Sequence, residues 1–162
     1  MSSYRVKDKV MHFREGLSFI SEEKEMNGTS YFIVEVVNGG EKVYVPKDKA
    51  DAIIRPLFNK KELKELIEYM KPIRPDYFNN TKQRRDVFKK RLSSGDIHDL
   101  AYLTMQLYYF NHPEEVDTPV KFGPADVDML KYEAKTMFDE LSLSLKIDRD
   151  EVEDYTYKLL KS

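Results

Sequence analysis

The hydrophobic pattern of the sequence changes its period near residue 57. Before this point, apolar residues alternate with polar ones or form short β-branched runs separated by Asn-Gly turns. After it, apolar residues recur every three to four positions, in blocks long enough for helices. Alternation is typical of half-buried strands, and the longer period is typical of amphipathic helices. The sequence therefore predicts an α+β protein with a small β module at 1–57 and an all-α helical module at 58–162.

The β module contains several strand-like segments joined by tight turns. Asn27-Gly28 indicates a two-residue hairpin loop, because both positions tolerate a positive φ. Pro46 has no backbone N–H, so it is expected at the end of a strand or at a sheet edge. Short strands with tight turns favour a small closed or half-closed barrel, because closure removes exposed edges. The predicted strands are Tyr4–Phe13, Leu17–Met26, Tyr31–Val37, Glu41–Val45 and a short fifth strand at Ala52–Arg55.

The second module contains helical segments separated by Pro, Gly and Asp residues. Ser94-Gly95-Asp96 predicts the end of one helix and the start of the next, because Gly95 tolerates a left-handed conformation and Asp96 can cap the following turn. Asp148 and Glu151 have the spacing of a capping box for a final helix. The predicted helices are Lys60–Met70, Thr81–Leu92, Ile97–Phe110, Pro124–Leu145 and a last helix that ends at Leu160.

Positive charge is concentrated in one short segment. The chain has a formal net charge of −2, yet residues 82–91 carry six basic side chains and one acidic side chain. Lys82, Arg85 and Lys89 fall within one sector of about 60° on a helix. A cationic helix face of this kind is suited to phosphate contacts. The simpler interpretation, a solvated helix face, stays open at this point because Lys and Arg are normally exposed.

The composition argues against an enzyme and against a membrane protein. Cysteine is absent, so the chain has no disulfide framework and no thiolate zinc site, and it fits the reducing cytoplasm. The three histidines are widely separated, and no phosphate-binding loop or catalytic triad pattern is present. No apolar run approaches the roughly 20 residues that a membrane span requires. We therefore expect a cytoplasmic protein without catalytic residues, metal ligands, cofactors or a small-molecule substrate.

Many short segments follow one another in an order and spacing typical of a known family. They are Tyr4–Val10, Gly16, Glu22–Gly28, Lys42–Pro46, Ile54-Arg55, Ser94-Gly95-Asp96, Met129-Leu130 and Asp139–Leu143. In these segments, which cover nearly the whole chain, the sequence resembles the CarD family of bacterial transcription regulators that bind RNA polymerase. The resemblance implies a Tudor-like N-terminal barrel, also found in the transcription-repair coupling factor, and a helical DNA-binding module behind it.

The resemblance assigns roles to both modules. Family members add an edge strand of the barrel to a sheet of the RNA polymerase β subunit, so that main-chain hydrogen bonds give affinity. The matching polymerase-binding positions here are Lys24, Lys42, Tyr44, Val45 and Pro46. The matching DNA-binding positions are Thr81, Lys82, Arg84, Arg85, Lys89 and Lys90. The implied partners are the polymerase β subunit and promoter DNA, which is contacted through its backbone with weak sequence preference.

Two departures from the family pattern bear on DNA binding. Members carry a Trp at the position of Thr81, and that Trp wedges into promoter DNA at the edge of the melted region. Thr81 has no flat apolar surface for an unstacked base step, which leaves Tyr77 or Phe78 as candidates. Asp86 takes a position that is often basic. Two alternatives therefore stay open: a polymerase- or protein-interaction module without DNA contact and, with less support, a small hydrolase or metal enzyme.

Overall fold

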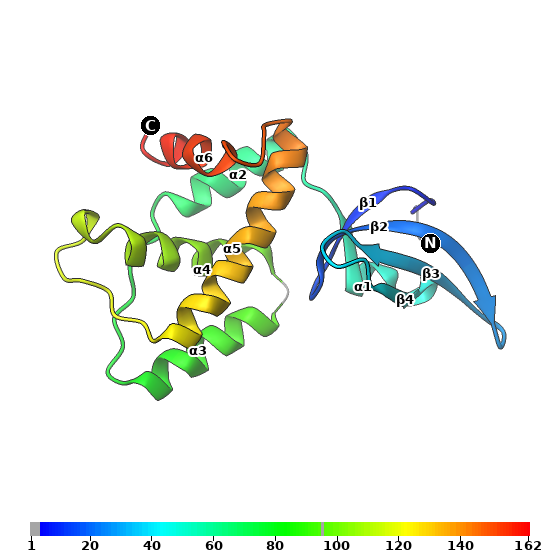
Figure 1. The fold of residues 1–162 in the computed structure, drawn as a ribbon, viewed down its shortest axis with the longest axis horizontal. Coiled ribbons are helices and arrows are strands. Elements are labelled where there is room, and N and C mark those ends of the chain that lie inside the picture. Colours follow the sequence, from blue (N-terminus) through cyan, green and yellow to red (C-terminus); the bar gives the residue numbers. More distant parts are fainter. Residues whose placement is uncertain (1–3, 95) are drawn as a thin grey trace. The chain divides into compact units, whose positions relative to one another are not determined.

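The computed structural model describes residues 4–94 and 96–162, and the chain divides into two compact units between Phe58 and Asn59. This boundary lies one residue after the one expected from the hydrophobic period. In the described residues, the first unit holds a five-stranded antiparallel sheet and the second holds the longer helices (Figure 1). The fold is thus mixed α+β, as the sequence predicts.

The sheet of the first unit is open. Its order is β4-β3-β2-β1-β5, and all neighbouring strands are antiparallel. Among the described residues, its two edges do not pair with each other: β4 pairs with β3, and the short β5 pairs with β1. The predicted closure into a barrel is therefore not confirmed. The strands are β1 Lys9–His12, β2 Gly16–Met26, β3 Thr29–Val36, β4 Lys42–Pro46 and β5 Ile54–Pro56.

Turn chemistry sets the register of the longest hairpin. Asn27 and Gly28 have φ angles of 52° and 81°, and they form the two-residue loop between the paired residues Met26 and Thr29. A loop of this length and conformation fixes which residues of β2 and β3 face each other. The predicted Asn-Gly hairpin is therefore confirmed.

Two strands of the first unit differ from the sequence-based prediction. Lys7 has a φ of 81°, which an extended strand does not allow, so β1 begins only at Lys9. The predicted strand at Ala52–Arg55 is largely wrong, because Ala50–Ile53 forms the short helix α1 and β5 begins at Ile54. A 3₁₀ turn, η1, leads from β4 into this helix.

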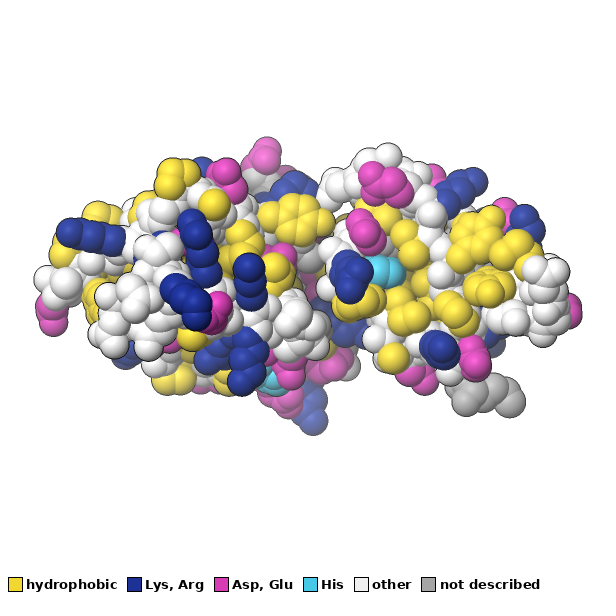
Figure 2. All heavy atoms as spheres, turned by 90° about the horizontal axis from the view of Figure 1, so that it is seen from below, with side chains coloured by type: hydrophobic (Ala, Val, Ile, Leu, Met, Phe, Trp, Pro, Cys, Tyr) yellow, Lys and Arg dark blue, Asp and Glu magenta, His cyan; other side chains and the backbone are white. Residues whose placement is uncertain are grey.

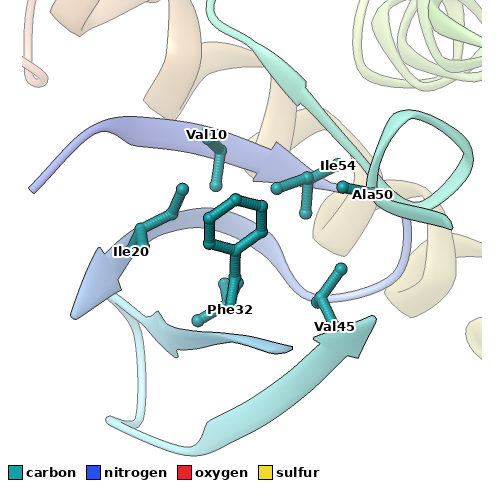
Figure 3. Close-up of a cluster of buried hydrophobic side chains, with 7 residues drawn as sticks. Val10, Ile20, Phe32, Val45, Ala50 and Ile54 are labelled. Carbon is teal, nitrogen blue, oxygen red and sulfur yellow. The ribbon is translucent and has the colours of Figure 1, made fainter. Parts of the chain in front are cut away.

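One cluster of buried apolar side chains forms the core of the first unit. Phe32 is 2% exposed, and the ring of Tyr4 meets it edge to face at 6.1 Å. Figure 3 shows side chains from the strands and from α1 pointing toward the Phe32 ring. Burial of these side chains on one face of the sheet is the main force that holds the unit together. The cluster consists of Val10, Ile20, Phe32, Val34, Val45, Ala50 and Ile54.

The second unit is built around α4. Every side chain from Ala101 to Tyr109 is buried, because this helix packs against α2, α3 and α5. The predicted helix boundaries are confirmed within one residue, except for the start of the last helix. None of the helices in the described residues is long and apolar enough to cross a membrane. The helices are α2 Lys60–Met70, α3 Thr81–Ser93, α4 Ile97–Asn111, α5 Pro124–Leu145 and α6 Val152–Leu160.

The capping prediction is confirmed at α4 and wrong at α6. Asp96 Oδ1 accepts a hydrogen bond from the His98 N–H at 2.7 Å, as expected of an N-cap. Gly95, the other residue of that signal, lies outside the described residues. At α6, the Glu151 N–H donates to the carbonyl of Asp148 at 2.9 Å, so these residues form a turn and the helix starts only after Glu151.

A half-buried carboxyl group on α5 makes the stability of the protein depend on pH. Burial alone raises the pKa of Glu133 to about 7, from the 4.5 of an ordinary glutamate. The folded state therefore holds this proton more tightly than the unfolded state, and the free energy of unfolding falls as the pH rises from about 4.5 to about 7. We predict that Glu133→Gln removes this loss and stabilises the protein by about 1–2 kcal/mol at about pH 8.

Urea denaturation at several pH values, followed by circular dichroism, measures this effect. Glu65→Gln, at an exposed position of α2, is the matched control and should leave the pH dependence unchanged. The same pH dependence in Glu133→Gln and in the wild type would contradict the assignment.

Candidate nucleic-acid interface

Two asparagines and a glutamine fix the start of α3. Asn80 Oδ1 accepts a hydrogen bond from the Gln83 N–H at 2.8 Å, which is the bond expected of an N-cap. The Asn79 N–H donates to Gln83 Oε1, also at 2.8 Å. The helix therefore starts at Thr81, whose side chain is exposed in the first turn.

The six basic side chains of residues 82–91 are divided between two faces of α3. Arg84 and Arg91 lie on the inward face with Phe88, at spacings of four and three residues. Phe88 is 1% exposed, and its ring meets those of Phe78 and Phe122 edge to face at 5.7 and 5.4 Å. This aromatic contact sets the rotation of the helix, and thereby decides which cations face outward.

Arg84 forms a buried ion pair with the first turn of α5. Its Nε and one terminal nitrogen lie 2.8 and 2.7 Å from Asp126 Oδ2, and the two side chains are 12% and 7% exposed. Its other terminal nitrogen donates to the Lys121 carbonyl at 3.3 Å. Arg84, which the sequence places among the DNA-binding residues, is thus held inside the fold, where Asp126 neutralises its charge. It does not belong to the candidate surface.

Arg91 fastens the other end of α3 to α4. Its Nη1 lies 2.8 Å from Asp99 Oδ1, and its guanidinium lies over the ring of Tyr102, 3.9 Å from the ring centroid. Ser94 Oγ donates to the second oxygen of Asp99 at 2.6 Å. The helix is therefore held at both ends by arginines that point inward.

The outward face of α3 carries the other four cations, all of them exposed: Lys82, Arg85, Lys89 and Lys90. The first three share the sector of about 60° that the sequence predicts. Figure 2 views the side of the second unit on which α3 lies in Figure 1, and it shows Lys and Arg side chains gathered there with an acidic side chain among them. With Thr81, five of the six predicted DNA-binding residues are thus exposed on one helix.

One acidic side chain interrupts the outward face. Asp86 lies between Lys82 and Lys90 around the helix, and its Oδ2 is 3.6 Å from Lys82 Nζ. The lysine and aspartate side chains are 88% and 65% exposed, so this ion pair contributes little to stability. Its effect is electrostatic, because the carboxylate lowers the positive potential on its own side of the face.

Polar side chains of α4 hold the connection that leads into α3. Gln106 is fully buried; its Nε2 donates to the Arg74 carbonyl and its Oε1 accepts from the Asp76 N–H, both at 3.0 Å. The Tyr102 hydroxyl donates to the Asp76 carboxylate, and burial raises the pKa of this tyrosine. That α4 holds this connection was not predicted from the sequence. The one feature of the sequence that indicates it is Gln106, a glutamine in the middle of an otherwise largely apolar helix.

Four of the five predicted polymerase-binding residues lie on β4, at one edge of the sheet in the first unit, and the fifth, Lys24, lies on the central strand β2. Tyr44 is 45% exposed, and its ring lies 6.0 Å from that of Tyr31. Val45 points the other way and is fully buried in the core, so only its backbone can take part in an interface. Because cross-strand partners share a face, the register places the other four predicted residues opposite the core: Lys24, Lys42, Tyr44 and Pro46.

Strand β4 also presents main-chain groups at the free edge of the sheet, since within residues 4–94 and 96–162 it pairs with β3 alone. The Val36 N–H donates to the Glu41 carbonyl at 2.8 Å and the Val36 carbonyl accepts from the Gly40 N–H at 3.0 Å, so the ladder is hydrogen-bonded at Val36, one position before the opposed residues Glu35 and Lys42. Hydrogen-bonded and non-hydrogen-bonded positions alternate along an antiparallel ladder, so the N–H and C=O groups of Lys42 and Tyr44 point away from β3. An unpaired edge of this kind can accept an added strand.

No protein-family model and no curated protein matches the sequence. In the part of the chain that the structure describes, no group of three or more His, Asp or Glu side chains is placed to hold a metal ion.

Arg84 and Arg85 are neighbours in sequence, but Arg84 is buried in an ion pair and Arg85 is exposed. Their alanine variants therefore form a matched pair. We predict that Arg84→Ala lowers the free energy of unfolding by about 3 kcal/mol, because it leaves Asp126 as an uncompensated buried charge. Arg85→Ala, at an exposed position, should change it by no more than about 0.5 kcal/mol. Urea denaturation followed by the helical circular-dichroism signal measures both. Equal losses in the two variants would contradict the inward and outward assignment.

Proposed function

We propose that this chain is a CarD-like transcription regulator that links RNA polymerase to promoter DNA. The first unit attaches to the polymerase β subunit by strand addition at β4, and the outward face of α3 contacts the DNA backbone. The observation that carries the proposal is the separation of charge on α3, where Arg84 is paired inside the fold, Arg91 is paired with Asp99 at its partly exposed end, and the other cations are exposed. The protein catalyses no reaction. It acts by binding the open promoter complex better than the closed one.

The strand order supports a Tudor-like relationship for the first unit. β5 follows a helical segment and returns beside β1, so that the strands curve around a single apolar core. A small sheet of this type that stops short of closure keeps an edge for a partner strand. Tyr44 has an exposed ring and its main chain at that edge, and tyrosine is enriched at interfaces.

The contact with DNA is proposed to involve phosphates and no melting wedge on α3. Thr81 offers no aromatic plane at the start of the helix. Phe78 is half-buried, and its ring packs edge to face against that of Phe88 at a centroid distance of 5.7 Å. Tyr77 is more exposed, but its hydroxyl is bonded to the carbonyl of Thr118 in the loop after α4. Cations that face outward without such a wedge support weak sequence preference.

A polymerase-binding module without DNA contact is the second candidate. Asp86 favours it, because this carboxylate lies among the cations and pairs with Lys82. The formal net charge of −2 favours it as well. The first candidate predicts that the chain binds DNA at low salt, and the second predicts that it does not.

DNA binding by the full chain is predicted to be weak and strongly salt-dependent. If three to four phosphates are contacted, the logarithm of the binding constant should fall with the logarithm of the salt concentration at a slope of about −3 to −4. Replacing Lys82, Arg85 and Lys89 by Ala should flatten this slope by about 3. Fluorescence anisotropy with a labelled duplex measures it.

The matched control replaces three exposed lysines of α2 by Ala, namely Lys60, Lys61 and Lys64. It removes the same number of charges from another helix, and it should change the slope far less. No binding at low salt would favour the protein-only candidate, and equal effects of the two triple variants would contradict a specific role for α3.

Polymerase binding is predicted to depend on the edge at β4. Tyr44→Glu should weaken binding to the polymerase β subunit by more than about tenfold, or ~1.4 kcal/mol, because it puts a charge where an added strand would lie. A pull-down with purified polymerase measures it, with Tyr155→Glu at an exposed position of α6 as the control. A wild-type chain that retains no polymerase would remove the basis of the proposal.

A further inference from the structure

A histidine side chain holds the turn between β1 and β2 closed. The loop 13–15 joins the paired residues His12 and Gly16, and Gly16 has a φ of 77°. His12 Nδ1 accepts one hydrogen bond from the Arg14 N–H and another from the Glu15 N–H, both at 3.1 Å. Asn or Asp side chains commonly close turns in this way. Here the acceptor is a group that can be protonated.

The ring of His12 is neutral in this arrangement. A nitrogen that accepts hydrogen bonds carries no proton, so the proton of the neutral ring is on Nε2. His12 is 7% exposed, and its partners in the sheet, Gly16 on β2 and Ile54 on β5, carry no charge. Burial lowers the pKa of His12 below the 6.5 of an ordinary histidine, while Glu15 acts to raise it and Arg14 to lower it further. The fold therefore disfavours the imidazolium.

Protonation of His12 removes both hydrogen bonds at once. A proton on Nδ1 puts a third donor against two backbone donors, and a donor without an acceptor inside a protein is costly. The N–H groups of Arg14 and Glu15 can then be satisfied only if the turn rearranges and they reach other acceptors or water. The two protonation states of one ring therefore correspond to two conformations of the turn.

The turn presents an exposed aromatic side chain whose position depends on the same ring. Phe13 is 47% exposed, and its ring stacks on that of His12 at a centroid distance of 5.1 Å. The Arg14 guanidinium lies 5.2 Å from the centroid of the Phe13 ring. The Phe13 N–H donates to the carbonyl of Ile53, at the end of α1, at 3.0 Å. Rearrangement of the turn therefore changes the exposed surface that Phe13 and Arg14 form.

We propose that the turn between β1 and β2 is a pH-sensitive switch, closed while His12 is neutral and open once its ring is protonated. The unfolded chain takes up this proton more readily than the folded one, so the free energy of unfolding falls as the pH falls from about 6.5 to the lower pKa of the folded state. Glu133 changes the same free energy in the opposite direction over this range. A local signal is therefore needed to observe the switch.

The test is an NMR study of the isotope-labelled full chain between about pH 7.5 and about pH 4.5, the range in which histidines titrate. At neutral pH, the imidazole nitrogen signals of His12 should place its proton on Nε2. The protection of the Arg14 and Glu15 amides against hydrogen exchange, corrected for the intrinsic effect of pH, should fall at least about tenfold as His12 titrates.

His12→Asn is the decisive variant, because an asparagine Oδ1 can accept the same two N–H groups and does not titrate. In this variant the two amides should keep their protection over the whole range. His98→Asn, at an exposed position of α4, is the matched control and should lose the protection as the wild type does.

A proton on Nδ1 at neutral pH would overturn the proposal, because that nitrogen could not accept the two bonds. Constant protection through the titration of His12 would overturn it as well, and so would an equal loss of protection in His12→Asn. If His12→Asn does not fold, as judged by circular dichroism, the position of the proton and the protection in the wild type still decide the question.

Discussion

The buried ion pair between Arg84 and Asp126 determines what the rest of α3 can do. It draws one guanidinium of the basic run into the fold and joins the start of α3 to the start of α5. Asp126 lies in the first turn of α5, where the helix dipole also favours a negative charge. Together with Phe88, this pair fixes the rotation of α3 about its own axis. The exposed cations face outward because Phe88 and this arginine both face inward.

Contacts with α4, the central helix of the second unit, also fix the position of α3. Gln106 and Tyr102 bind the connection 71–80, and Asp99 binds Arg91 at the far end of α3. Most of these bonds join residues more than twenty positions apart in the sequence, so the cationic surface depends on the packing of the unit and not on helix propensity alone. A change in the core below α3 is therefore expected to alter the surface above it.

Local patterns were enough to predict the helices but not all of their contacts. Thr81 begins α3 and Asp96 caps α4, because caps and the helical period act within a few residues. The division of the cations was missed, although Arg84, Phe88 and Arg91 have the spacing of one inward face. Closure of the sheet could not be predicted from strand lengths, since it depends on whether the edge strands β4 and β5, which are separated in sequence by a helical segment, meet in space.

The alternation of exposed and buried side chains along β4 could also have been predicted from the sequence. It separates the buried Val45 from its exposed neighbour Tyr44, so the two residues offer different groups to a partner. The strand contributes main-chain groups and the tyrosine ring, whereas α3 contributes charge. The proposed regulator thus uses two kinds of recognition, one in each unit, and neither requires a pocket.

The most direct measurement follows the arginine side-chain N–H signals of the full chain by NMR as duplex DNA is added. We expect the Nε–H signal of Arg85 to shift progressively as DNA is added, and salt to reverse the shift. The signals of Arg84 and Arg91 should stay in place, because their partners are Asp126 and Asp99. Shifts at Arg84 or Arg91 with no change at Arg85 would contradict the division of charge on which the proposal depends.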